Sequence, residues 1–317
     1  MALPLDVYDA FMLAAGTNAR QNVRKTSLVN GKAERSCVAG RYPIERGFHM
    51  DNKGRKKGWI PDVPDHRDLL YAAPPEVLTA LKENVDLRPK CPPVYDQGNL
   101  GSCTANAIAA AMEFERMRQK LRKYVPSRLF IYFNERSMEG TVNSDSGAQI
   151  RDGIKSVARQ GVCSEQEWPY DIAKFTEKPS PLCYRDALKD RAVLYSRVSR
   201  TLNQMKGCLA SGYPFVFGFS VYEYFEGPEV AKTGVAQMPK PGERLLGGHA
   251  VMAVGYDDSQ QRFIARNSWG GRWGMKGYFT LPYSYLSDPN LSDDFWTIRL
   301  VSAEDLRRVA RQRQRRS

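Results

Sequence analysis

The character of the sequence changes at Gly212. Before it, residues 103–123 and 201–211 carry apolar side chains at helical spacing, and the second pattern ends at that glycine. After it, residues 215–221 and 250–256 are rich in aromatic and β-branched residues, which favour strands. Helices followed by antiparallel strands predict an α+β fold, with a helical and a β subdomain and a cleft between them.

Two of the predicted strands form a hairpin. Residues 257–261 have the polar composition of a turn and join strand 250–256 to strand 262–267. Antiparallel pairing across this turn places His249 at the start of one strand and Asn267 at the end of its neighbour. We therefore expect an imidazole and a side-chain amide to meet on the β subdomain.

A reactive thiol is predicted at Cys103. It precedes the Ala-rich stretch 104–112, so it lies at or near the N-terminus of a helix. Unsatisfied N–H groups and about half a positive charge at such a terminus favour the thiolate. In the chain order Cys103, His249, Asn267, these groups match those that a cysteine hydrolase uses.

Four ordered motifs closely resemble those of the papain-like cysteine peptidases. They are Pro93-Val94-Tyr95-Asp96-Gln97-Gly98, Gly101-Ser102-Cys103, Gly248-His249-Ala250-Val251 and Asn267-Ser268-Trp269-Gly270. The separation of Cys103 from His249 falls within the family's usual span of about 130–150 residues. The resemblance covers about residues 84–300. It implies a papain-like fold and a cysteine endopeptidase that acts on proteins or peptides without a cofactor or a metal.

The resemblance assigns catalytic roles to individual residues. Cys103 is expected to attack the scissile carbonyl, with His249 as its base partner. Asn267 would fix the imidazole rotamer, and Gln97 would donate its side-chain amide to the oxyanion. Trp269 is expected to shield the bond between His249 and Asn267 from water.

Further residues are expected, by the same resemblance, to bind substrate. The substrate backbone would add as a strand along Ser146-Gly147, where the family has paired glycines. The pocket for the second residue upstream of the cut would be lined by Gln149, Gly218, Gly247 and Ala250. Two glycines there suggest room for a bulky side chain.

The sequence also departs from the family pattern. Thr104 follows the nucleophile, where the family usually has an aromatic residue. Leu100 and Ser144 stand where the family commonly has a pair of bonded cysteines, and the absence of both fits a reducing compartment. The five cysteines other than Cys103 are expected to be reduced thiols, and the lack of a CxxC motif argues against a zinc site.

Residues 1–83 are predicted to form an N-terminal extension to a peptidase domain at 84–300. The extension is broken by glycines and lacks the family's helical propeptide pattern, so it resembles bacterial papain-like enzymes with a short N-terminal extension. We expect part of residues 1–50 to lie across the cleft as an intramolecular inhibitory segment, which would make the chain latent. A flexible leader without contacts is the alternative.

The net charge of +12 is concentrated in residues 53–57 and in an Arg-rich tail, 301–317. No aromatic residues interleave these runs, so we expect solvated surfaces and no nucleic-acid site. No apolar run approaches the roughly 20 residues that span a bilayer, so no membrane span is expected. The N-terminus makes a poor secretory signal, which predicts a cytoplasmic product as synthesised and leaves export by another route open.

Two other functions remain open from the sequence. One is a thiol-dependent transferase or isopeptidase, because acyl-enzyme formation is common to both reactions. The other is an inactive binding protein on a papain fold, against which the presence of all four expected catalytic residues argues. His49 and His66 have no motif around them and are assigned to the surface or to local structure.

Overall fold

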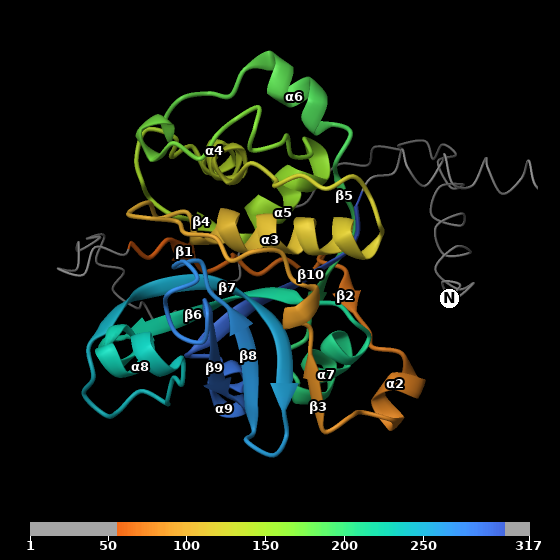
Figure 1. Ribbon diagram of the computed structural model, residues 1–317, viewed down its shortest axis with the longest axis vertical. Coiled ribbons are helices and arrows are strands. Elements are labelled where there is room, and N and C mark those ends of the chain that lie inside the picture. The colour runs from red at the N-terminus through yellow and green to blue at the C-terminus, as the bar shows by residue number, and fades with distance from the viewer. Residues whose placement is uncertain (1–55, 302–317) are drawn as a thin grey trace, which may run out of the picture. The chain divides into compact units, whose positions relative to one another are not determined.

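The computed structural model describes residues 56–301, which lie in one compact unit. Its helical half contains α4, α5 and α6, drawn in the upper part of Figure 1, and the sheet forms the lower part. The long helix α3 runs between the two and packs against α4 and α5 on one side. On the other side it packs against the strands β7 (Leu245–Asp257) and β10 (Ser292–Val301). The predicted α+β fold is confirmed. The helices of this half are α3 (Cys103–Arg118), α4 (Arg128–Glu139), α5 (Ile150–Arg159) and α6 (Pro181–Ala187).

The main sheet has eight strands within the described residues. Seven lie in the order β2 (Leu70–Tyr71), β5 (Ala192–Val198), β10 (Ser292–Val301), β6 (Phe215–Tyr222), β7 (Leu245–Asp257), β8 (Arg262–Arg266) and β9 (Tyr278–Pro282), and β3 (Asn84–Asp86) pairs with β7. Among the strand pairs of this sheet that the described residues form, β2–β5 is the only parallel one.

The predicted hairpin corresponds to β7 and β8, in which Met252 pairs with Arg266. His249, however, lies inside β7 rather than at its start. Strand β7 begins earlier because β6 pairs with it as far as Tyr222 opposite Leu245.

Several short helices complete the fold: α2 (Pro75–Thr79), α7 (Leu202–Ala210), α8 (Pro228–Thr233) and α9 (Tyr283–Ser287), with 3-10 turns at Arg88–Lys90, Ile172–Lys174 and Glu223–Glu226. The pattern at 201–211 predicted α7. The helices α6, α8 and α9 were not predicted, since they are too short to display an apolar period.

Local sequence explains where the helices begin and end. Ser127 caps α4 by accepting a hydrogen bond from the backbone of Phe130, and Gly140 ends this helix in the left-handed conformation, at φ 72°. Helix α3 stops at Arg118, short of the predicted residue 123, because Lys120 has φ 57° and turns the chain out of the helix.

Residues 56–73, which precede the predicted peptidase domain, pack on both halves of the body. Strand β1 (Trp59–Ile60) pairs in parallel with β4 (Ala148–Gln149), which leads into α5. Strand β2 then pairs with β5 of the main sheet, and Tyr71 and Ala73 enter the hydrophobic core. Residues 56–73 therefore follow a path from the helical half to the sheet.

The cysteines other than Cys37 and the expected absence of a membrane span concern residues 56–301, and several other sequence predictions fall outside this range. Cys91, Cys103, Cys163, Cys183 and Cys208 are free thiols. No helix formed by residues 56–301 is both long and apolar enough to cross a membrane. The inhibitory segment expected within residues 1–50, Cys37, His49 and the Arg-rich tail lie outside the described residues, apart from Val301.

Candidate active site

Cys103 is the first residue of α3, as its sequence context predicted, and its exposed fraction is 0%. Burial raises the pKa of its thiol to about 12, while backbone hydrogen bonds from Ala250, Gly58 and Thr104 act in the opposite direction. The thiolate expected at this helix terminus is therefore disfavoured in the described state. The physical reason is that the sulfur has been removed from water.

His249 and Asn267 meet across the hairpin, with 2.8 Å between Nε2 and Oδ1. The amide oxygen of Asn267 also accepts a hydrogen bond from the backbone of Ser268 at 2.8 Å, which fixes its orientation. The ring of Trp269 lies 4.9 Å from the imidazole, and the ring of Phe219 lies 5.8 Å from it in an edge-to-face arrangement, both measured between centroids. These rings shield the pair from water.

Gln97 is completely buried beside the loop that follows Asn267. Its side-chain oxygen accepts a hydrogen bond from Ser268 Oγ at 2.6 Å, so the amide nitrogen points the other way. That nitrogen donates to the carbonyl of Leu100 at 2.9 Å and to the carbonyl of Lys56 at 3.2 Å. A peptide carbonyl from the N-terminal part of the chain therefore already lies on Gln97.

The chain's own residues Lys56–Ile60, here called the occluding segment, lie over Cys103. Gly58 is pressed against the loop before the nucleophile, because a Cβ on Gly58 would lie 1.7 Å from the carbonyl oxygen of Gly101. On its other side, the carbonyl of Gly58 accepts a hydrogen bond from the backbone N–H of Ala148 at 2.7 Å. No side chain other than hydrogen fits at Gly58 in this position.

The backbone of the predicted substrate strand is only partly available. Gly147 N donates to the hydroxyl oxygen Oη of Tyr132 at 3.3 Å, and the carbonyl of Gly147 accepts a hydrogen bond from Ser146 Oγ at 3.0 Å. The N–H that bonds the occluding segment belongs to Ala148, the next residue. Gly147 also lies against the occluding segment, because a Cβ on Gly147 would meet the carbonyl oxygen of Gly58 at 2.2 Å. That Ser146-Gly147 binds the backbone of a substrate stays a prediction.

The indole of Trp59 takes the position predicted for a substrate side-chain pocket. A Cβ on Gly218 would lie 1.9 Å from this indole, and one on Gly248 would lie 2.6 Å from it. The indole Nε1 donates to Asp294 Oδ2 at 2.9 Å. The predicted room for a bulky side chain is therefore filled by a tryptophan of the chain itself.

The other residues predicted for this pocket contact neighbouring parts of the N-terminal segment. Gly247 faces the side chain of Lys57, Gln149 Oε1 accepts from the backbone of Val63 at 3.3 Å, and the backbone of Ala250 bonds to Cys103. Gly248 and Asp294 were not predicted. The adjacent glycine pair was a usable signal for Gly248, whereas nothing local in the sequence marks Asp294.

Two lysines of the basic run 53–57 hold the occluding segment rather than facing water as expected. Lys56 Nζ lies 2.7 Å from Asp145 Oδ2. Lys57 forms an ion pair with Glu226, and both side chains are buried. These carboxylates draw the lysines onto the body, because a buried charge is tolerated only when it is paired.

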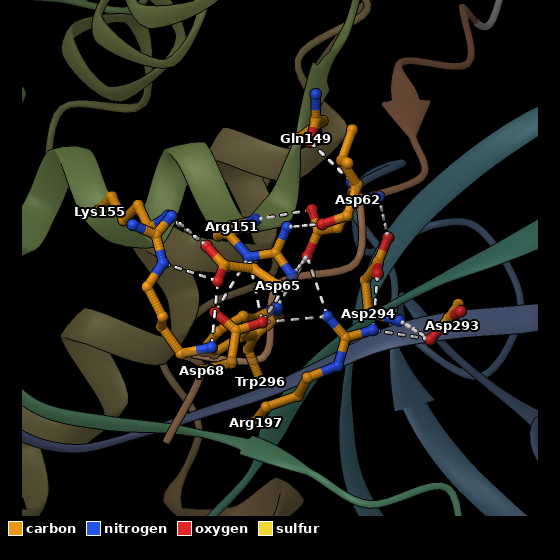
Figure 2. Close-up of polar contacts among 12 residues, drawn as sticks. Asp62, Asp65, Asp68, Gln149, Arg151, Lys155, Arg197, Asp293, Asp294 and Trp296 are labelled. Atoms are coloured by element: carbon orange, nitrogen blue, oxygen red, sulfur yellow. Dashed lines mark hydrogen bonds and ion pairs between the residues drawn. The ribbon is translucent and has the colours of Figure 1, made fainter. Parts of the chain in front are cut away.

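A cluster of buried charges follows the occluding segment (Figure 2). Asp62 Oδ1 accepts from the backbone of Arg151 at 3.0 Å, and Asp62 Oδ2 accepts from Trp296 Nε1 at 3.0 Å. Burial, and then the neighbouring carboxylate of Asp294, raise the pKa of Asp62 to about 7. Burial likewise raises the pKa of Asp294.

Comparison with known proteins places this geometry in a family. Residues 81–288 match the model of the papain family of cysteine proteases. The chain is 43% identical over 273 residues to an uncharacterised peptidase C1-like protein of Acanthamoeba polyphaga mimivirus, with 78% of this chain and 88% of that protein covered. It is 30% identical over 232 residues to chymopapain of Carica papaya, covering 68% of this chain and 58% of that protein.

Among solved structures, the chain is similar to xylellain, a cysteine protease from Xylella fastidiosa. The TM-score is 0.74 at 48% sequence identity, and the match covers 78% of this chain and 96% of that chain. The papain-like fold and the cysteine-peptidase class predicted from the sequence motifs are confirmed.

Proposed function

The chain belongs to the papain family of cysteine proteases, and from this premise we propose that it is an endopeptidase held latent by its occluding segment. The proposal has two parts, a catalytic group of four residues and a block over the nucleophile. The likeness to xylellain, a cysteine protease from Xylella fastidiosa, supports placing the chain among bacterial enzymes of this family.

In the proposed reaction, Cys103 Sγ forms a bond to the scissile carbonyl carbon and the carbonyl electrons move to oxygen. Gln97 Nε2 stabilises that oxyanion. His249, protonated by the thiol, passes the proton to the leaving amine as the C–N bond breaks. Water, deprotonated by His249, then releases the acyl group as a carboxylic acid and restores the thiol.

The contacts of His249 support its proposed role. Its Nε2 bonds to Asn267, so the other ring nitrogen is the one oriented for the proton transfers. Trp269 and Phe219 keep water from competing for this bond. In a dry site the hydrogen bond is stronger than in water, and it holds the ring through both steps.

The observation that carries the latency is the hydrogen bond from Gln97 Nε2 to the carbonyl of Lys56. The donor proposed for the oxyanion is occupied, the sulfur is covered beside Gly58, and Trp59 fills the side-chain position at Gly218. A peptide substrate would need all three places. The occluding segment therefore has to leave before a substrate can bind.

An inhibition experiment tests the proposal. A thiol-directed epoxide should label Cys103 of the wild-type chain slowly, through the fraction of molecules whose occluding segment has left, and should stop the peptide hydrolysis of that fraction. Cys103→Ala should show neither label nor turnover. Cys91→Ala is the matched control, because this half-buried thiol lies outside the proposed site. Peptide hydrolysis by Cys103→Ala at the wild-type rate would contradict the catalytic assignment.

A further inference from the structure

The occluding segment continues directly into an extended stretch, Pro61–Asp68, here called the strap. Pro61 and Pro64 flank Asp62 and restrict the backbone to extended conformations. The strap lies outside the group of residues proposed for catalysis. It packs against α5, β5 and β10 through the charged cluster of Figure 2.

Ion pairs hold the end of the strap. Arg151 Nη2 lies 2.5 Å from Asp68 Oδ2, and the guanidinium Nε also donates to this carboxylate at 3.2 Å. Arg197 Nη1 lies 3.6 Å from both Asp68 Oδ2 and Asp62 Oδ2. The side chains of Asp68 and Arg151 are only 8% and 5% exposed, so water screens their attraction weakly.

Asp294 joins the strap to the occluding segment. One of its oxygens, Oδ2, accepts a hydrogen bond from the indole of Trp59 at 2.9 Å and another from the backbone N–H of Asp62 at 2.8 Å. The other oxygen pairs with Arg197 at 3.1 Å. Displacing the strap therefore removes a contact from the carboxylate that also orients Trp59.

We propose that the strap is a latch: its buried contacts through Asp62 and Asp68 hold the occluding segment over Cys103, and breaking either contact opens the site. This inference rests on the latency proposed above. The inference adds the residues that control the occluding segment, Asp62 and Asp68. Both lie outside the occluding segment and away from Cys103.

Asp62 and Asp68 can hold the strap closed because their contacts are buried. Removing one partner of a buried, hydrogen-bonded pair leaves the other partner unsatisfied, which is far more costly than losing a pair at the surface. Arg151 N and Trp296 Nε1 would lose their acceptor in Asp62→Ala. In Asp68→Ala the Arg151 guanidinium would lose its closest carboxylate and keep only the carbonyl of Val63 and the more distant Asp62, at 4.0 Å. These groups lack a partner only while the strap covers them. The substitutions therefore destabilise the closed state, and the equilibrium shifts toward release of the strap.

The strap supplies its own matched control. Asp65 carries the same charge as Asp68, but its carboxylate pairs with the exposed Arg67 and reaches Lys155 Nζ only at 4.0 Å. Asp65→Ala thus removes an equal charge from the same strap without breaking a buried contact. It is expected to leave the latch closed.

The test is the rate at which iodoacetamide alkylates Cys103 in the full-length chain, measured by mass spectrometry of the peptide that contains it. When closure is fast, this rate follows the open population. We expect alkylation at least about tenfold faster in Asp62→Ala and Asp68→Ala, and within about twofold of wild type in Asp65→Ala. Cys208, also fully buried, reports global unfolding in the same samples.

Equal alkylation of Cys103 in wild type and all three variants would overturn the latch. If Cys103 and Cys208 become reactive together, Asp68→Asn decides, since it keeps the side-chain shape: a rise confined to Cys103 supports the latch and no rise overturns it. Selective opening without any peptide hydrolysis would support the latch and contradict the peptidase proposal. If the wild-type chain hydrolyses peptide as fast as the variants do, the latch and the proposed latency are both overturned.

Discussion

The side-chain amide of Gln97 donates a hydrogen bond to the main-chain carbonyl of Lys56, with 3.2 Å between Nε2 and O. The two residues are 41 positions apart, and the bond links the proposed oxyanion donor to the N-terminal part of the same chain. Ser268 fixes the orientation of Gln97 from the opposite side. Gln97 is therefore oriented toward a peptide carbonyl before any substrate arrives.

Replacing Gln97 should separate catalysis from access. In Gln97→Ala, we expect kcat for a peptide to fall about 10²–10³-fold, because one oxyanion donor is lost. Alkylation of Cys103 should be no slower, since the same change removes a contact of the occluding segment. The exposed Gln166→Ala serves as control, and unchanged kcat in Gln97→Ala would contradict the assigned role.

A methyl group on Gly58 should open the site. In Gly58→Ala the new Cβ would meet the carbonyl oxygen of Gly101 at 1.7 Å, and backbone on both sides leaves no room to adjust. We expect faster alkylation of Cys103 and greater peptide hydrolysis per chain. Gly271→Ala is the matched control, because a Cβ there meets nothing within 4 Å. Alkylation of Gly58→Ala at the wild-type rate would show that this segment does not limit access.

Removing the amide that holds the imidazole should cost both activity and stability. In Asn267→Ala we expect a smaller loss of kcat/KM than in His249→Ala, since the general base remains. The free energy of unfolding should fall by about 1–3 kcal/mol, because buried groups on His249 and Ser268 lose their acceptor. Thermal unfolding and peptide kinetics measure the two effects. A greater activity loss in Asn267→Ala than in His249→Ala would reverse the proposed roles.

Local sequence patterns were enough to predict the elements that carry the proposed catalytic residues. The Ala-rich stretch after Cys103 predicted α3, and Gly212, with a φ of 84°, follows α7 as expected. The hairpin that joins His249 to Asn267 was likewise predictable, because strand, turn and strand are consecutive. In each case the determining contacts lie within a few residues or across one turn.

The contacts that close the site could not be predicted in the same way. Trp59 and Asp294 are 235 positions apart, and their bond depends on the register of β10. An irregularity in the pairing of β10 with β6, between Asp293 and Trp296, accompanies a left-handed φ of 58° at Asp294. An acidic residue at that position gives no local signal that its carboxylate will be buried beneath an indole.

Raising the pH should loosen the occluding segment. The pKa of Asp62 rises from 3.8 to about 7 when its side chain is buried beside Asp294. The closed state therefore binds a proton more tightly than the released state does, and this favours closure fully below about pH 4 and is lost as pH rises through 7. The charged groups facing Asp62 are Arg151 on α5, Arg197 on β5 and Asp294 on β10. Arg197 in turn pairs with Asp68 on the strap and with Asp293 on β10.

Fluorotryptophan NMR of the Cys103→Ser chain measures this effect without the thiol's own titration. We expect the Trp59 resonance, identified by its loss in Trp59→Phe, to move from its closed to its released position as pH rises through about 7. Asp294→Asn should lower the midpoint, because it removes the negative charge that raises the pKa of Asp62. A Trp59 resonance that stays constant from about pH 5 to pH 9, or that shows release on acidification, would contradict the role assigned to this carboxylate.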